Sequence, residues 1–317
     1  MGFLLRLILP LLLSCNAAAQ DWPTRPVRIV VPFAVGGSLD FVIRAISDPL
    51  AKELGQPVVV DNRTGASGNI GADYVAKQPA DGYLLLAGWD GLAANPHLYK
   101  LTYDPAKAFV PVIKLTTQPI VIAVHPSLKV DDFAGLIAAA KANPGGIPFG
   151  TSGAGTGQHM LGEWIAQAAG VQLTHVPYKG GGAAIADLIG GQIQLASLGS
   201  GPVMAHHNRG AVKIIAQSTA ARSQSLRNVP TLQEAGLAGV VLDQWLGIFA
   251  VAGTPPAVVD KLNAALRRIL SDPDIKAKLA QQGLDVDAGS PEAFAQQYKS
   301  DYESYQRLTK QLNIKVE

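Results

Sequence analysis

The chain is poor in the residues that disulfides, metal clusters and nucleic-acid interfaces require. Its 317 residues include one cysteine, Cys15, so no disulfide can form within the chain. There is no paired-cysteine motif and no HExxH sequence, and we therefore expect neither a metal site nor any other cofactor. Charged residues make up 16% of the chain and the formal net charge is +2, which leaves no strongly basic face for nucleic acid. Hydrophobic residues, at 48%, suffice for a globular protein with two compact lobes.

An apolar run near the N-terminus predicts export. Arg6 precedes the apolar residues 7–13, and the small residues 17–19 form a cleavage site before Gln20, so we predict a signal peptide over residues 1–19. The run is too short to span a bilayer. A second route is open, because residues 12–15 also resemble a lipobox that would leave a lipid on Cys15. We favour ordinary cleavage, and both routes export the protein to the periplasm.

Segments with strand and helix patterns alternate along the chain, which is typical of an α/β protein with parallel sheets covered by helices. Two apolar segments, residues 112–124 and 245–251, are predicted to cross between two lobes. The first lobe then comprises residues 22–121 and 246–317, and the second comprises residues 122–245. We expect each lobe to hold a mainly parallel sheet flanked by helices, with a ligand cleft between the lobes.

Three glycine-rich loops follow predicted strands. The first contains Gly36, Gly37 and Ser38, and the others span residues 65–71 and 150–157. Glycine permits tight turns and close approach, Ser38 can cap the next helix, and amides at a helix N-terminus attract anions. Because neither GxxxxGK[ST] nor a complete GxGxxG occurs, a phosphate cradle is not supported. Each loop alone could be a simple turn, but three at strand ends favour a site for a small polar ligand.

Alternative roles stay open for four residues near these loops. Ser152 and His159 could be the nucleophile and base of an exported hydrolase, although their loop does not match GxSxG. His159 could instead secure the loop through a hydrogen bond to the backbone. Trp89 and Asp90 follow the predicted strand 83–87, and they either face the cleft and shape ligand choice or serve packing and turn capping.

A series of short motifs, each weak alone and specific in this order, runs through nearly the whole chain. They comprise residues 25–33, Gly36-Gly37-Ser38 with Asp40, residues 55–63, 68–72, 81–83, 95–99 and 103–105, Gly155-Thr156 with His159, and residues 175–180, 190–192, 229–231, 234–236 and 253–255. In this combination the chain resembles the extracytoplasmic solute receptors of tripartite tricarboxylate transporters, the Bug receptors of proteobacteria.

The resemblance implies a two-lobed, type II-like periplasmic binding protein that is not an enzyme. Such a receptor closes around a small organic acid, commonly a carboxylate, and delivers it to membrane permease subunits. The ligand would be held mainly by backbone amides, hydroxyls and ordered water rather than by salt bridges. We expect a monomer. A role in which the closed protein presents its ligand to a membrane sensor kinase is an alternative.

Carried over residue by residue, the resemblance places ligand contacts on both lobes. They are Phe33, Gly37, Ser38 and Asn69 on the first lobe, and Thr151, Ser152, Gly153, Thr156 and His159 on the second, with Tyr178 at the rim. To these we add Trp89 and Asp90. The chain departs from the family pattern at Leu39, Thr64, Ser67, the loop 88–91 and Leu198. The chain has an acidic residue at Asp90 where the family usually has small, hydroxyl-bearing ones, and it has Leu198 where the family frequently has an aspartate. These differences indicate a rearranged pocket, so an aromatic or amide-bearing acid, or a ligand whose amine contacts Asp90, is an alternative to a dicarboxylate.

Overall fold

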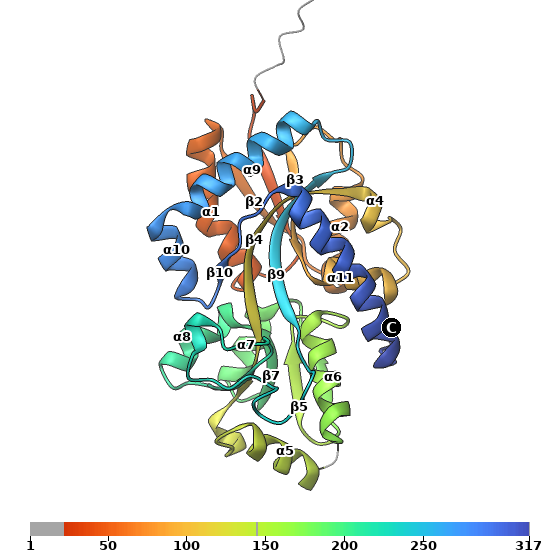
Figure 1. Ribbon diagram of the computed structural model, residues 1–317, viewed down its shortest axis with the longest axis vertical. Helices are drawn as coiled ribbons and strands as arrows, with labels where there is room; N and C mark the ends of the chain where they lie inside the picture. Colours follow the sequence, from red (N-terminus) through yellow and green to blue (C-terminus); the bar gives the residue numbers. More distant parts are fainter. Residues whose placement is uncertain (1–21, 144, 317) are drawn as a thin grey trace, which may run out of the picture.

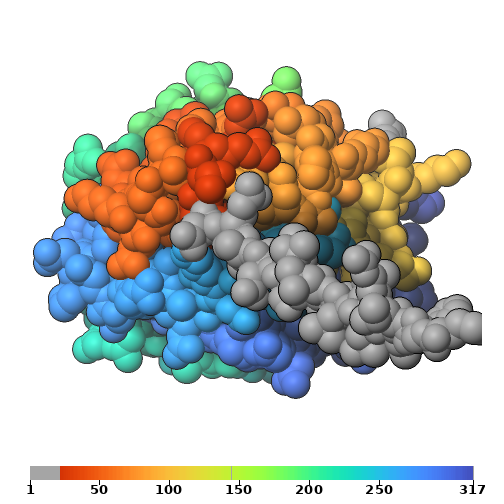
Figure 2. All heavy atoms as spheres, turned by 90° about the horizontal axis from the view of Figure 1, so that it is seen from above, coloured from red at the N-terminus to blue at the C-terminus, as the bar shows by residue number. Residues whose placement is uncertain are grey.

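Two lobes are stacked in the computed structural model, which describes residues 22–143 and 145–316. In Figure 1 the upper lobe is red, orange and blue and the lower lobe is green, so the beginning and the end of the chain share one lobe. Strands β4 (Phe109–Val124) and β9 (Asp243–Val251) run between the lobes. Figure 2 shows the early and late segments lying together on the outer face of the upper lobe.

The upper lobe is built on the strand order β2-β1-β3-β9-β4, with β10 paired to β4. In β1 four of five residues are buried, because helices cover the sheet and favour apolar side chains on both of its faces. The further elements of this lobe are β1 (Val27–Val31), β2 (Val58–Asn62), β3 (Leu84–Trp89), β10 (Asp285–Val286), α1 (Ser38–Leu54), α2 (Asn69–Ala76), α3 (Gly91–Ala94), α4 (Pro105–Ala108), α9 (Pro256–Ser271), α10 (Pro273–Ala280) and α11 (Pro291–Gln311).

The lower lobe continues the sheet from β4 through β7 and β5 to β6, and β8 also pairs with β4. One apolar cluster around Phe149, Leu161 and Ile165 packs with α5 and α6, and a second around Leu188 and Leu198 packs with α7 and α8. The elements are β5 (Pro148–Thr151), β6 (Thr174–Pro177), β7 (Leu195–Gly199), β8 (Lys213–Gln217), α5 (Phe133–Ala142), α6 (Gly157–Ala169), α7 (Gly181–Ile189) and α8 (Ser200–Asn208).

The strand directions correct one detail of the predicted fold. Parallel pairing is found between β1 and its neighbours β2 and β3, and between β5 and its neighbours β6 and β7. Both crossing strands pair only antiparallel, β9 with β3 and β4, and β4 with β7, β8 and β10. The sheets are mixed rather than mainly parallel because β4 leads from the upper lobe to the lower one and β9 returns beside it. On the β7 side of β4, the pairing with β9 ends at Pro119 and that with β7 begins at Ile120.

Aromatic packing fixes the last helix, α11, to the returning strand β9. The rings of Trp245 and Phe294 meet edge to face with centroids 5.0 Å apart, and those of Phe249 and Tyr298 meet at 5.4 Å. This packing holds α11 beside the crossing strands and brings Tyr305 beneath the junction of the lobes. Within the described ranges, no helix is both long and apolar enough to cross a membrane.

Candidate ligand-binding cleft

A small cavity of about 40 Å³ lies where the two lobes meet. A single water needs roughly 10–15 Å³ of such volume, so the cavity has room for about three or four waters as the lobes stand here. A bound dicarboxylate therefore requires the lobes to lie slightly farther apart. Its lining comes from both lobes and from both crossing strands, and consists of Phe33, Gly37, Ser38, Leu39, Asp40, Trp89, Gln118, Ser152, Gln158, Gly181, Gly199, Pro202, Gln244 and Leu246.

The starts of three helices surround this cavity. Gly37 is the N-cap residue of α1, Gly181 is the first residue of α7, and Gly199 is the N-cap residue of α8. The expectation that Ser38 caps α1 is wrong, because Ser38 is already the first helical residue and no side chain caps this end. The first turn of a helix leaves backbone N–H groups without intrahelical partners, and the helix dipole places positive partial charge there. Three such ends at one cavity create a favourable environment for an anion.

The lining contains one charged side chain, Asp40, and its charge is already compensated. Its carboxylate lies 3.0 Å from Arg44 Nε and accepts hydrogen bonds from Gly36 N at 3.1 Å and from Asn62 Nδ2 at 3.0 Å. The part of the chain that the structure describes places no lysine or arginine in the lining. An anion held here would therefore be bound by uncharged donors.

Three glutamines form the floor of the cleft: Gln118 from β4, Gln244 from β9 and Gln158 from α6. Gln118 Nε2 donates to Gln244 Oε1 at 2.8 Å, and Gln158 Nε2 approaches the same oxygen at 3.4 Å. All three side chains are buried. Sequence reasoning missed these residues. A single amide side chain in each mostly apolar crossing strand was a usable signal for Gln118 and Gln244, whereas Gln158 on α6 had no such signal.

Trp89 and Phe33 form an aromatic wall. Their rings meet edge to face with centroids 5.2 Å apart, and the six-membered edge of the Trp89 indole packs against the Cα atom of Gly68. Only 2% of Trp89 is exposed, and its Nε1 has no hydrogen-bond partner among the described residues. This side chain limits the width of the cleft on the upper-lobe side.

Asp90 lies beneath the cleft and does not line it. It is fully buried, and its two carboxylate oxygens accept hydrogen bonds from Gln244 Nε2 and from the Tyr305 hydroxyl, each at 2.8 Å. Burial raises the pKa of Asp90 to about 6, while these two hydrogen bonds oppose the rise. Its influence on a ligand therefore passes through Gln244 rather than through direct contact.

The loop between β5 and α6 is stabilised by its own polar side chains. Thr156 caps α6, and its hydroxyl donates to Gly153 O at 2.8 Å. Thr151 Oγ1 donates to the same carbonyl at 3.1 Å, and Ser152 N donates to Gln158 Oε1 at 3.0 Å. Of the second-lobe residues named from the sequence, Ser152 alone lines the cavity, and Thr151, Gly153 and Thr156 shape the loop that carries it.

His159 secures this loop, as one of the two sequence interpretations predicted. Its Nδ1 accepts a hydrogen bond from Gly155 N at 3.0 Å, and its Nε2 lies 3.6 Å from Glu163 Oε1. The ring stacks on His175 with centroids 3.8 Å apart. Burial, aided by His159, lowers the pKa of His175 to about 3, so the stack contains a neutral His175 at neutral pH.

Two further residues named from the sequence lie outside the cavity lining. Asn69 is buried at the start of α2, where its Oδ1 accepts a hydrogen bond from Asn95 Nδ2 at 2.8 Å. The Tyr178 hydroxyl donates to Asp187 Oδ2 at 2.7 Å, and burial followed by this contact raises its pKa to about 12.

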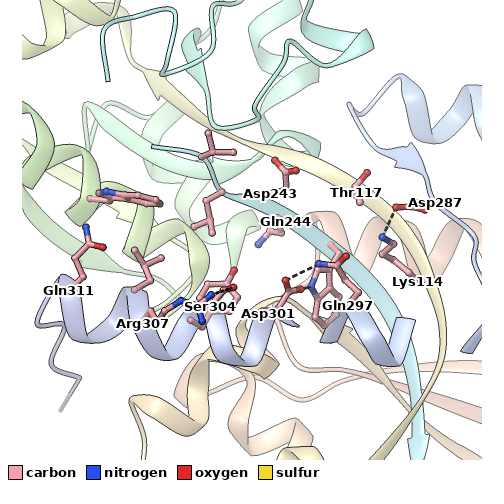
Figure 3. A pocket seen from close by; sticks show the side chains of 16 residues that line it. Lys114, Thr117, Asp243, Gln244, Asp287, Gln297, Asp301, Ser304, Arg307 and Gln311 are labelled. Carbon is pink, nitrogen blue, oxygen red and sulfur yellow. Dashed lines mark hydrogen bonds and ion pairs between the residues drawn. The ribbon is translucent and has the colours of Figure 1, made fainter. Parts of the chain in front are cut away.

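A larger cavity, of about 630 Å³, opens on the α11 side of the crossing strands (Figure 3). Two of its five charged side chains form an ion pair, with Lys114 Nζ 2.6 Å from Asp287, and a third, Asp301, accepts hydrogen bonds from Gln297 and Trp245. The strand-end loops and helix starts described above belong to the smaller cavity. We therefore take the smaller cavity as the candidate site.

The fold and this cleft define a two-lobed solute-binding protein. Residues 42–314 match the tripartite tricarboxylate transporter family receptor. The chain is 37% identical over 298 residues to a UPF0065 protein from the tcbD-tcbE intergenic region of Pseudomonas sp. (strain P51), covering 93% of this chain and 89% of the relative. The chain belongs to the tripartite tricarboxylate transporter receptor family, as the sequence motifs predicted.

Solved structures support the same assignment. R. palustris Rpa4515 with adipate has a TM-score of 0.90 and 35% identity, covering 93% of this chain and 99% of that one. The periplasmic binding protein BugD has a TM-score of 0.89 and 33% identity, and the match covers 93% of this chain and 100% of BugD. MatC from Rhodopseudomonas palustris with bound malate has a TM-score of 0.84 and 31% identity, and the match covers 90% of this chain and 99% of MatC. These neighbours confirm the two-lobed α/β fold. They are solute-binding proteins, and BugD, by its description, is periplasmic.

Proposed function

We propose that this protein is a periplasmic receptor that captures a small carboxylate between its lobes and delivers it to the permease subunits of a tripartite tricarboxylate-type transporter. The observation that carries the proposal is the convergence of three helix starts and three buried glutamine amides on one interlobe cavity. Such neutral, preorganised donors stabilise a carboxylate without a cationic partner. Two family structures hold adipate and malate, which supports this ligand class.

The proposal includes export and hinge closure. Residues 1–19, the proposed signal peptide, and Cys15 lie outside the described residues. The proposed lobes, residues 22–121 with 246–317 and residues 122–245, would close as two bodies about β4 and β9. Ligand bound between them would stabilise the closed form, and that form would dock on the permease as a monomer.

The environment of His159 argues against the hydrolase alternative. A general base for Ser152 needs a free ring nitrogen within reach of the serine hydroxyl. In this structure Nδ1 of His159 accepts a hydrogen bond from Gly155 N, and the ring is stacked on His175. Recovery of an incubated acid unchanged from the purified protein would support a receptor, and its conversion would support an enzyme.

A calorimetric titration of the purified protein with a panel of acids, including malate and adipate, tests the proposal. We expect at least one small carboxylate to bind and to raise the unfolding temperature. Ser38→Ala, which removes a hydroxyl from the cavity, should weaken binding by about five- to tenfold. Ser47→Ala is the matched control, because Ser47 lies on the same helix, is also buried, and donates to Ile43 O.

Delivery needs a separate test. Uptake of the labelled acid into cells that produce the permease subunits should require this protein and should be reduced by Ser38→Ala. If no carboxylate of the panel binds, the proposed ligand class is wrong. If binding occurs without any contribution to uptake, the sensory alternative gains support.

A further inference from the structure

We propose that Asp90 is a positioning residue that acts through Gln244, Gln118 and Gln158, the glutamine relay, to make the cleft floor a surface of hydrogen-bond donors that selects carboxylates. The proposal rests on the proposed function and adds the means by which the ligand class is chosen. Asp90 lies outside the cavity lining, so the lining residues by themselves do not reveal this role.

The relay begins at Asp90, whose carboxylate, when ionised, can only accept hydrogen bonds. Asp90 Oδ1 accepts from Gln244 Nε2 at 2.8 Å, which turns the Gln244 amide so that its oxygen faces the other two glutamines. That oxygen accepts from Gln118 Nε2 at 2.8 Å and from Gln158 Nε2 at 3.4 Å. The orientation of one amide therefore sets the orientation of the next two.

The far ends of the relay meet hydrogen-bond donors. Ser152 N donates to Gln158 Oε1 at 3.0 Å, and Gln118 Oε1 is approached by the Ser200 hydroxyl at 3.3 Å and by Gly201 N at 3.4 Å. A peptide N–H cannot accept, so reversing Gln158 or Gln118 would set its NH₂ group against Ser152 N or Gly201 N. The constraint is firmer on Gln158, because the Ser200 hydroxyl beside Gln118 can accept as well as donate.

This arrangement has a chemical consequence for the ligand. Each amide oxygen already accepts a hydrogen bond: Gln244 Oε1 from the other two glutamines, Gln118 Oε1 from Ser200 and Gly201, and Gln158 Oε1 from Ser152. Each Nε2, in contrast, carries a second hydrogen with no acceptor among the described residues. Gln118, Gln158 and Gln244 line the cavity. The unused groups of the floor are therefore mainly donors, which favours a carboxylate over the NH₂ group of a carboxamide.

Asp90 is held in place from several elements. On α11, Tyr305 donates to Oδ2 at 2.8 Å, and Asp301 of the same helix raises the pKa of Asp90 by repulsion. From β9 comes Gln244, which donates to Oδ1 at 2.8 Å. From α6 comes Gly157, whose Cα lies so close to Asp90 Oδ2 that any side chain there would collide. The carboxylate thus touches both lobes and the returning strand.

Nuclear magnetic resonance of the glutamine side-chain amides tests the relay without any ligand. Burial raises the pKa of Asp90 to about 6, so the amide signals of Gln244, Gln118 and Gln158 should change together with one midpoint near that pH. Asp90→Asn should abolish the common change, and Gln244→Leu should leave the signals of Gln118 and Gln158 independent of pH. Unlinked signals, or signals that still titrate in Gln244→Leu, would overturn the relay.

Binding of adipate and adipamide, its diamide, tests the selectivity. The affinity ratio of adipate to adipamide should fall about tenfold in Gln244→Leu and Asp90→Leu. Asp90→Asn, which keeps an acceptor for Gln244, should restore most of the ratio. A purely structural role would weaken both compounds equally and leave the ratio unchanged, which would contradict selection by the relay. If the unmutated protein binds neither compound, the proposed ligand class fails for this probe, and the resonance experiment still decides the relay.

Discussion

Trp89 is the bulkiest side chain in the wall of the cleft. We expect it to limit the size of the ligand without affecting the selection of its charge. Its ring packs on Phe33 and Gly68, and 2% of it is exposed. We expect Trp89→Ala to lower the free energy of unfolding by about 3–5 kcal/mol, as large-to-small changes of buried aromatic residues do. The space created should also raise the affinity for suberate, the eight-carbon dicarboxylate, relative to that for adipate.

Denaturant unfolding and calorimetric titration measure the two effects of Trp89→Ala. Trp89→Phe is the control, because it removes less volume and should give a smaller loss of stability and a smaller shift in preferred length. If the alanine variant folds and the ratio of its affinities for suberate and adipate is unchanged, Trp89 does not set the length of the ligand.

The raised pKa of Asp90 predicts that the free energy of unfolding depends on pH. Its folded-state value of about 6 lies above the ordinary value of 3.8, so the folded state holds this proton more tightly than the unfolded state does. The resulting stabilisation is complete below the unfolded value and is lost as pH rises through about 6. The loss amounts to about 3 kcal/mol by linkage.

Asp90→Asn cannot titrate, so the unfolding free energy of the unmutated protein should fall relative to that of the variant between pH 4 and pH 7. Urea titrations at a series of pH values give both curves. Parallel curves would show that Asp90 has an ordinary pKa in the folded protein.

Patterns in the sequence identified residues at the edges of the cavity but not the glutamines of its floor. Gly37, Ser38 and Ser152 could be found because a glycine-rich loop before a helix is a local pattern. Gln118 and Gln244 lie 126 positions apart and meet only when β4 and β9 pair. A local pattern cannot report such a contact. Asp90 was noticed for its position after a strand, but its burial depends on α11, which is brought there from the end of the chain.

The N-terminus of helix α6 fixes the loop that carries Ser152 at the cleft. Thr156 accepts a hydrogen bond from His159 N and donates one to Gly153 O. Thr156→Ala removes both contacts and should lower the free energy of unfolding by about 0.5–2 kcal/mol. It should also weaken ligand binding, because the loop that holds Ser152 loses its connection to α6.

Thr156→Ser is the matched control, since it keeps the hydroxyl and should restore stability and binding together. Urea unfolding and calorimetric titration provide the measurements. Equal losses in the serine and alanine variants would mean that the methyl group, and not the cap, is responsible.

A capping pattern can form its contacts without a regular helix behind it. Thr231 and Glu234 have the Thr-x-x-Glu spacing of a capping box, with Thr231 N donating to Glu234 Oε2 at 2.8 Å and Glu234 N donating to Thr231 Oγ1 at 3.1 Å. The segment is nevertheless a turn. One helical hydrogen bond forms, from Ala235 N to Thr231 O at 2.9 Å, and Gly236, with φ of +100°, then ends the helical geometry.

For the whole molecule, the central feature is that direct hydrogen bonds already join the lobes. Ala34 N donates to Lys179 O at 3.1 Å, which links the loop after β1 to the loop before α7. The Tyr99 hydroxyl donates to Ala154 O at 2.6 Å, and Ser67 Oγ donates to the same carbonyl. These contacts stabilise the closed form, whereas an open form would expose their polar groups to water. Affinity for the ligand therefore depends on the population of the closed form.

Tyr99→Phe tests this dependence, because it removes one interlobe hydroxyl and leaves the cavity lining unchanged. We expect the affinity for the tightest-binding acid to fall about two- to tenfold, the effect of one lost hydrogen bond on the closing equilibrium. Small-angle X-ray scattering should show a larger radius of gyration for the variant than for the unmutated protein at the same low ligand concentration, and the same radius at saturation. Tyr83→Phe is the control, since the Tyr83 hydroxyl bonds to Thr24 within the upper lobe. If both variants bind equally well, the Tyr99 contact does not contribute to closure, and the closed form depends on the other interlobe contacts, including those of Ala34 and Ser67.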